Sequence, residues 1–198
     1  MNLVDYHNAA IRTAKWFPSV QENLEHAALG LTTEIGEFAT VVKRVAIYGK
    51  PMTPEMREHA LEELGDCYWY LPLACHAMGT TLERVVAEST KNAGSLIAAM
   101  PELSLKHSCI TLAAIGGTFS MYSASISVQG QVSEIDEIKR VVALIVMCLN
   151  QCCRTLDADP MDVRAANIDK LRLRFPDAYT DEAAEARADK GGLDARNS

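Results

Sequence analysis

Apolar residues fill long stretches separated by turn residues, and no run alternates apolar and polar residues over more than a few positions. This pattern favours helices and gives no support to a β-sheet. The predicted helices cover, in order, residues 5–16, 21–47, 54–78, 80–92, 104–128, 133–156 and 159–174, with a short one expected between 180 and 190. The pattern therefore predicts an all-α protein.

Residues with known preferences for helix ends mark the boundaries. Thr53, Thr80, Ser133 and Asp159 are the predicted N-caps, because a side-chain oxygen there can accept a hydrogen bond from an unpaired backbone N–H. Thr80 is followed three residues later by Glu83, which is the spacing of a capping box. Glycine or proline lies between most of the predicted helices, as expected for turns.

An internal repeat is indicated when the chain is shifted so that His26 lies on His107 and Phe38 lies on Phe119. The order of two long helices and a shorter one repeats as well. We therefore predict one domain made of two fused helical units, a pseudo-dimer within one chain. The domain covers residues 1–176, its units cover about 20–92 and about 104–176, and a polar tail covers 177–198.

Composition and charge narrow the class of protein. Hydrophobic residues make up 48% of the chain and aromatic residues only 6%, which favours helices packed on helices. The net charge of −7 and the lack of a basic patch argue against a nucleic-acid polymer as partner. A small anionic substrate stays compatible with an acidic site if metal ions lie between them.

Cysteine usage and the N-terminal sequence bear on location. None of the six cysteines forms a C-x-x-C pair, so we expect buried free thiols in a reducing compartment. The first ten residues lack the basic and then apolar pattern of a secretion signal. The apolar stretch from Val141 to Cys153 is interrupted by Asn150 and Gln151 and is too short to span a bilayer. We expect a cytoplasmic protein with no membrane partner.

Two pairs of acidic residues stand out within strongly apolar helices. Glu34 and Glu37 share one helical face, and so do Glu63 and Asp66 on the next predicted helix. An antiparallel return of the second helix would bring four carboxyl groups into one volume. Such a pair alone usually marks a solvated face, but buried carboxylates are costly unless their charge is compensated. Few Lys or Arg residues are nearby, and oxygen ligands suit Mg²⁺ or Mn²⁺, which favours a metal site completed by phosphates.

Three motifs resemble those of the all-α nucleoside triphosphate pyrophosphohydrolases, the MazG-like group related to dimeric dUTPases and dCTP pyrophosphatases. The stretch His26–Glu37 is similar to the family's E-x-x-E motif, Glu62–Leu71 to its E-x-x-D motif, and Asn167–Pro176 to its N-x-x-K element. The resemblance implies a helical bundle that hydrolyses a (deoxy)nucleoside triphosphate to the monophosphate and pyrophosphate, in control of the nucleotide pool.

The resemblance also implies roles for individual residues. The acidic set of Glu34, Glu37, Glu63 and Asp66 would hold Mg²⁺, or Mn²⁺, and so serve the catalytic step. The positions that match substrate-contacting residues of the family are Tyr70 for the sugar and Asn167, Lys170 and Arg174 for the phosphates.

The chain departs from the family pattern in the place of the N-x-x-K motif. Single-unit members carry it soon after the E-x-x-D helix, whereas residues 89–92 here are Ser-Thr-Lys-Asn and Asn167 lies in the second unit. The second unit in turn has isoleucine and threonine where the first has Glu34 and Glu37. We therefore expect the first unit to supply the metal ligands, the second unit the phosphate contacts, and the chain one active site.

Two other functions stay open at the level of sequence. One is a non-catalytic helical interaction module derived from this fold, and the other is a pyrophosphohydrolase that acts on phosphoribosyl-ATP. The base preferred by a nucleotide hydrolase depends on the shape of a pocket between helices, which spacing does not give. A fused pair of units can stand alone or form a homodimer or higher homo-oligomer.

Overall fold

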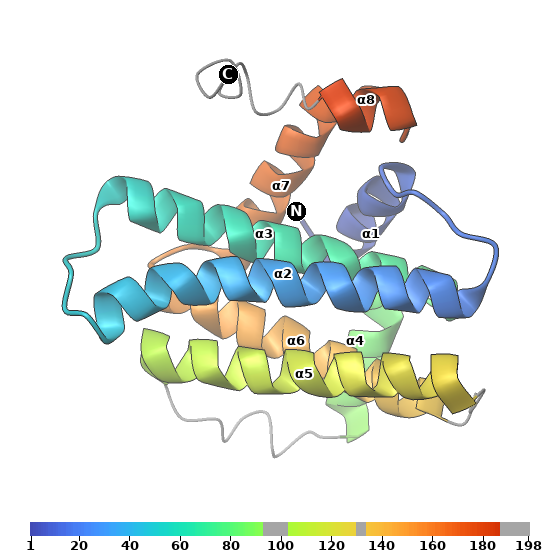
Figure 1. Ribbon diagram of the computed structural model, residues 1–198, viewed down its shortest axis with the longest axis horizontal. Coiled ribbons are helices and arrows are strands. Elements are labelled where there is room, and N and C mark those ends of the chain that lie inside the picture. Colours follow the sequence, from blue (N-terminus) through green and yellow to red (C-terminus); the bar gives the residue numbers. More distant parts are fainter. Residues whose placement is uncertain (93–102, 130–133, 187–198) are drawn as a thin grey trace.

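The computed structural model describes residues 1–92, 103–129 and 134–186 (Figure 1). Within these residues the chain forms helices and no strand, which confirms the prediction of an all-α protein. The helices are α1 (Leu3–Arg12), α2 (Val20–Ala46), α3 (Pro54–Ala77), α4 (Leu82–Asn92), α5 (Leu105–Gln129), α6 (Ile135–Thr155), α7 (Pro160–Arg174) and α8 (Asp181–Ala186).

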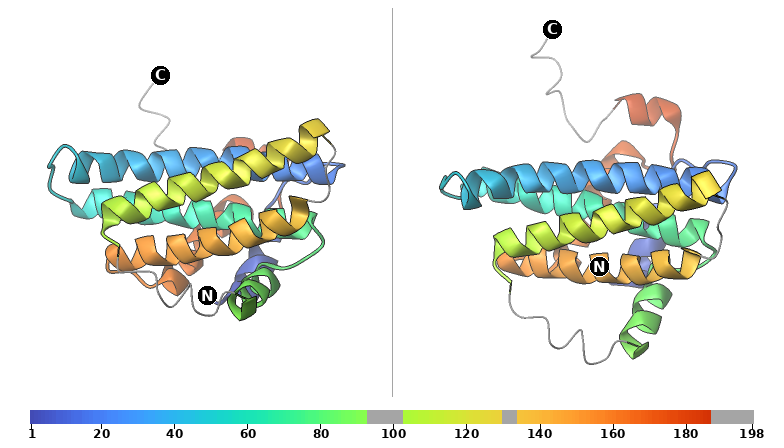
Figure 2. Two further views of the ribbon diagram at one scale, coloured as in Figure 1. Left: turned by 90° about the horizontal axis from the view of Figure 1, so that it is seen from below. Right: turned by 60° about the horizontal axis from the view of Figure 1, so that its bottom comes forward.

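Four long helices form the central bundle. α2 packs along α3 and along α5, and α6 completes the bundle against α5 and α3 (Figures 1 and 2). Apolar side chains from all four helices fill the space between them. The fully buried side chains include Leu24, Leu31, Phe38, Leu64, Leu71, Leu112, Phe119, Ile138 and Leu149.

The shorter helices α4 and α7 pack crosswise, meaning that each covers a long helix from the other half of the chain. α4, which follows α3 in the chain, packs against α6, and α7, which follows α6, packs against α3. α1 lies against α3, α4 and α7 and so joins both peripheral helices to the bundle. Figure 2 shows α4 and α7 on the outside of the four long helices.

The observed caps agree with two of the four predicted N-caps. Thr53 and Asp159 accept hydrogen bonds from the backbone N–H groups of Met56 and Met161, at 3.2 and 2.7 Å. The prediction for Thr80 is wrong by one residue, because Thr81 accepts the bond from the next turn, at 3.3 Å from the N of Arg84. Ser133 lies outside the described residues, and α6 begins after Glu134 without a side-chain cap.

α1 and α8 differ in extent from the prediction. α1 begins earlier because Asn2 caps it, accepting from the backbone N–H of Asp5 at 2.9 Å, and it ends at Arg12 rather than near residue 16. The predicted helix between 180 and 190 is observed over Asp181–Ala186, and the rest of that segment and of the tail lies outside the described residues.

α7 is fixed closely against α3 near the acidic residues. A Cβ on Gly65 of α3 would lie 3.1 Å from the Cβ of Asn167, so only glycine allows this approach without a shift of α7. The buried Tyr6 of α1 donates from its hydroxyl to Asn167 Oδ1 at 2.8 Å. Arg57 of α3 donates to the backbone oxygens of Leu156 and Asp157, at 2.8 and 2.9 Å. These contacts fix where the side chains of α7 meet those of α3.

One long helix is apolar on its outer side as well. Between Ser108 and Gln129, α5 carries no charged residue, and Ile110, Met121 and Val128 are exposed. Within the described residues its window Leu105–Ile126 is long and apolar enough to cross a membrane, a test that core helices of soluble proteins also pass, and α6 with α7 passes it only as a pair bent by 99°. The α5 window is longer than the apolar stretch from Val141 to Cys153 in α6.

Candidate metal centre

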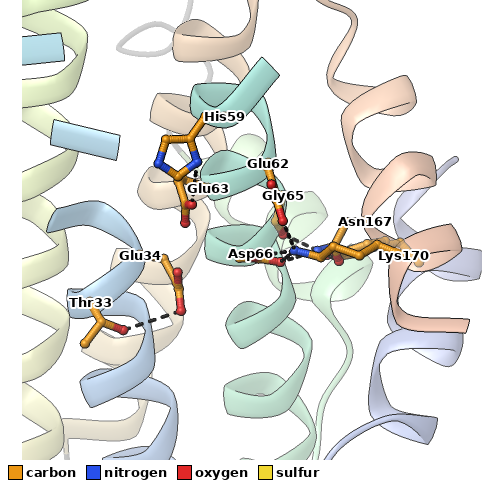
Figure 3. Close-up of polar contacts among 10 residues, drawn as sticks. Thr33, Glu34, His59, Glu62, Glu63, Gly65, Asp66, Asn167 and Lys170 are labelled. Atoms are coloured by element: carbon orange, nitrogen blue, oxygen red, sulfur yellow. Dashed lines mark hydrogen bonds and ion pairs between the residues drawn. The ribbon is translucent and has the colours of Figure 1, made fainter. Parts of the chain in front are cut away.

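The two acidic pairs face each other across the contact between α2 and α3. One carboxylate oxygen each from Glu34, Glu63 and Asp66 lies within 4.8 Å of the other two (Figure 3). Glu37 lies one turn further along α2, close to Glu63 as well. Because the helices run antiparallel, residues three apart on one meet residues three apart on the other. The arrangement expected from the spacing of the four acids is therefore the one observed.

These side chains open into a small cavity of about 180 Å³. Seven of the eight site residues named from the sequence line it, and Asn167 lies behind Asp66 instead. The lining residues are Glu34, Glu37, Glu62, Glu63, Asp66, Trp69, Tyr70, Lys170, Leu171 and Arg174.

Glu63 lies at the centre of the acidic group and is only 5% exposed. Burial raises its pKa to about 8, and a hydrogen bond shared with Glu34 and the charges of Glu37, Glu34 and Asp66 act in the same direction. Burial likewise raises the pKa of Glu34, although its hydrogen bond with Glu63 opposes that rise. Without a cation, Glu63 therefore retains a proton near neutral pH.

Asp66 is held by two side chains of α7. Asn167 Nδ2 donates to Asp66 Oδ1 at 2.7 Å, and Lys170 Nζ donates to Oδ1 and Oδ2 at 2.7 and 2.6 Å (Figure 3). Burial raises the pKa of Asp66 and the charge of Lys170 offsets part of that rise. Burial lowers the pKa of Lys170, but Asp66 and Glu62 more than compensate, so Lys170 stays positively charged. α7 thus places the ammonium group of Lys170 and the amide of Asn167 against Asp66 at the rim of the cavity.

An aromatic wall lies beside the acidic group. The rings of Trp69 and Tyr70 are 4.9 Å apart at their centroids, and His26 packs edge-on against both. Trp69 Nε1 donates to Thr13 Oγ1 at 2.9 Å, which ties the ring to the end of α1. A Cβ on Gly30 would lie 2.1 Å from the Tyr70 ring, so the bare backbone of α2 there leaves the space that this ring fills.

The donor set fits a hard divalent cation. Five carboxyl groups line the cavity with two basic side chains, Lys170 and Arg174, and three carboxylate oxygens are close enough to share an ion. Oxygen ligands of this kind suit Mg²⁺ and Mn²⁺ better than soft metals. Glu34, Glu63 and Asp66 would hold the ion, with Glu37 beside them.

Two residues of the site were missed in the sequence. Glu62 accepts a hydrogen bond from Lys170 at 3.1 Å, and His59 Nδ1 lies 3.0 Å from Glu63 Oε1. His59 is one turn before Glu63 on α3, so the i, i+4 spacing could have drawn attention to it. Glu62 likewise lies four residues before Asp66, but its contact with Lys170 on another helix does not follow from spacing.

Comparison of the chain with protein-family models, with curated proteins and with solved structures finds no match. A fold alone does not determine an activity, since one fold can carry many chemistries. The function therefore has to follow from the residues around the cavity and their geometry.

The raised pKa of Glu63 predicts how the metal-free protein responds to pH. The unfolded carboxyl titrates near 4.5 and the folded one near 8, so the stabilisation from the bound proton is complete below pH 4.5 and is lost as the pH rises to 8. The Glu63→Gln variant should flatten this loss and, at pH 8, have a free energy of unfolding larger than wild type by on the order of a few kcal/mol, and so unfold at a higher temperature. Thermal unfolding in a chelator from pH 5 to 8 measures this. Glu58→Gln, an exposed position on the same helix, is the control, and equal slopes in all three proteins would contradict the prediction.

The contact of Gly30 with Tyr70 predicts a second effect. Gly30→Ala should displace the Tyr70 ring and destabilise the protein by roughly 1–3 kcal/mol. Gly36→Ala on the same helix is the matched control, because a Cβ there meets nothing within 4 Å and should stabilise the helix by up to about 1 kcal/mol. Denaturant unfolding measures the stabilities, and near-ultraviolet circular dichroism reports on the Trp69–Tyr70 pair. An unchanged spectrum and stability in Gly30→Ala would show that the ring is not confined there.

Proposed function

We propose that this chain is a Mg²⁺-dependent pyrophosphohydrolase of nucleoside triphosphates, (d)NTP + H₂O → (d)NMP + pyrophosphate. The observation that carries the proposal is the convergence of Glu34, Glu63 and Asp66 within 4.8 Å of one another, beside the ammonium group of Lys170. Carboxylates that share a divalent ion next to a basic side chain suit a substrate whose reacting part is a chain of phosphates. The three motif resemblances in the sequence point to the same reaction class.

The chemistry needs one bond formed and one broken. A water oxygen attacks the α-phosphorus, the bond to the α–β bridging oxygen breaks, and pyrophosphate leaves. Divalent ions, when bound, supply neutralisation of the phosphate charge and Lewis acidity. The protein holds the attacking water and the phosphates in line, and its charged groups are already in position before the substrate binds.

Each wall of the cavity has a part in that task. Lys170 favours the charged form of Asp66 against the effect of burial and orients it, and in the complex it contacts phosphate oxygens together with Arg174. Asn167 supports Asp66 from behind through a hydrogen bond of 2.7 Å. Tyr70 and the neighbouring Trp69 present an apolar face on which a sugar or base can pack. The side chains of α3 and α7 therefore act together, although they are far apart in sequence.

The crosswise packing supports a two-unit origin with one active site per chain. α2, α3 and α4 have 27, 24 and 11 residues, and α5, α6 and α7 have 25, 21 and 15 in the same order. The third helix of each set packs on the second helix of the other. Ile115 and Thr118 stand in α5 where Glu34 and Glu37 stand in α2, so a second set of metal ligands is missing there.

A panel of substrates tests the proposal directly. The protein should release monophosphate and pyrophosphate from one or more of the common NTPs and dNTPs with Mg²⁺, and none in the presence of a chelator. Phosphoribosyl-ATP belongs in the same panel, because turnover of that compound alone would identify the related histidine-pathway activity instead. No turnover of any compound, with a thermal midpoint indifferent to Mg²⁺, would leave the non-catalytic interaction module as the better hypothesis.

Lys170→Ala tests the division of roles between α3 and α7. Loss of this cation should lower kcat/KM by about 10²-fold or more, because it removes a preorganised positive charge, while Mg²⁺ binding survives. Arg172→Ala is the matched control on the same helix, since Arg172 is exposed and pairs with Asp169. Steady-state kinetics with calorimetric Mg²⁺ titration separates the two effects. If Lys170→Ala showed wild-type kinetics, the proposed part of α7 in the active site would be wrong.

A further inference from the structure

A histidine, His59, extends the cluster of acidic residues along α3. His59 lies one turn before Glu63 on α3 and faces Glu37 of α2 (Figure 3 shows His59 above Glu63). One ligand atom each from Glu37, His59 and Glu63 lies within 4.8 Å of the other two. The two antiparallel helices thus form two neighbouring sets of three, and both sets contain the buried Glu63.

The separations in both sets, at most 4.8 Å, come close to those around a single ion. Ligand atoms bonded to an ion at about 2.1 Å lie roughly 3 Å apart when adjacent and roughly 4 Å apart when opposite. His59 Nδ1 and Glu63 Oε1, at 3.0 Å, have the adjacent spacing already. Paired ions in hydrolytic sites are typically about 3.5–4 Å apart, a distance that a shared carboxylate can bridge.

The ligand types in the two sets differ. Glu34, Glu63 and Asp66 offer oxygen alone, which suits Mg²⁺. Glu37, Glu63 and His59 offer oxygen and one imidazole nitrogen, a mixture that binds first-row transition ions more tightly than it binds Mg²⁺. His59 is half exposed and has no buried partner other than Glu63 among the ion pairs of the described residues, so its ring can turn toward an ion at low cost.

We infer that His59 is a metal ligand, which completes with Glu37 and Glu63 a second ion site selective for a first-row transition ion such as Mn²⁺. The inference deepens the proposed function and rests on it, because Glu63 bridges both ions. The protein would then hold a mixed pair, with Mg²⁺ exchangeable on the Asp66 side and the transition ion retained on the His59 side. A merely structural His59–Glu63 pair would give neither nitrogen ligation nor a second ion.

Mn²⁺ is the probe, because its electron spin reports directly on a bonded imidazole nitrogen. Calorimetry should give two Mn²⁺ per wild-type chain, and pulsed electron paramagnetic resonance should detect nitrogen coupling to one of them. His59→Ala should lose the nitrogen coupling and bind the second ion at least about tenfold more weakly, while Mg²⁺ affinity of the oxygen set changes far less. His107→Ala, an exposed histidine on α5, is the control and should match wild type. His59→Asp should regain the second ion without the coupling.

The outcomes separate this inference from the proposed function. Mn²⁺ binding without nitrogen coupling in wild type overturns the role of His59 and leaves the acidic metal site standing. Wild-type binding of neither Mn²⁺ nor Mg²⁺ overturns both. The wild-type spectrum decides the matter even if His59→Ala does not fold.

Discussion

The hydrogen bonds to Asp66 are the contacts on which the arrangement of the site depends. Asp66 is a carboxylate on a central helix, and Lys170 and Asn167 reach it from a helix that follows 100 residues later. Asn167 in turn accepts from the buried hydroxyl of Tyr6, which also donates to the backbone oxygen of Gly65 at 3.3 Å. In a buried network of this kind each bond strengthens its neighbours, and a missing member leaves others unpaired. One carboxylate therefore couples α1, α3 and α7 and keeps one end of the cavity in place.

At the other end of the cavity, the charges of the Glu34 and Glu63 carboxyl groups repel each other. Glu34 and Glu63 come from helices that apolar packing holds side by side, so their carboxyl groups lie close together. Their mutual repulsion and their burial are offset by a shared proton in the metal-free protein, and by cations in the proposed working state. Asp66 is paired with a cation, whereas Glu63 is surrounded by other carboxyl groups, so the Glu63 side of the cavity favours an added positive charge.

Local sequence rules predicted the helices and their ends well, because helix formation and capping depend on residues close together in the chain. The helix periods, the caps at Thr53 and Asp159 and the two acidic faces all follow from spacings of four residues or fewer. The failure at Thr80 has a local cause too, since two adjacent threonines offer the same oxygen and only the path of the backbone selects Thr81. The meeting of the acidic pairs needed one further assumption, an antiparallel return.

Contacts between segments far apart in the sequence could not be predicted from such local rules. Asp66 and Lys170 are 104 residues apart, and their proximity was expected only through the motif resemblance. The approach of Gly30 to Tyr70 and of Gly65 to Asn167 depends on the distance between helix axes, which no periodicity contains. The spacing of His59 to Glu63 was visible in the sequence, but its nearness to Glu37 exists only across the contact between α2 and α3.

The crosswise attachment of α4 and α7 has a consequence for how this chain folds. Since each outer helix covers a partner from the opposite end of the sequence, neither end can bury its apolar surface by itself. Folding should then be all-or-none across both ends, with slow closure because the essential contacts are so distant along the chain. Separate synthesis of the two ends would yield fragments that stay unfolded until they meet, and their reassembly would restore the acidic pocket at the moment of association.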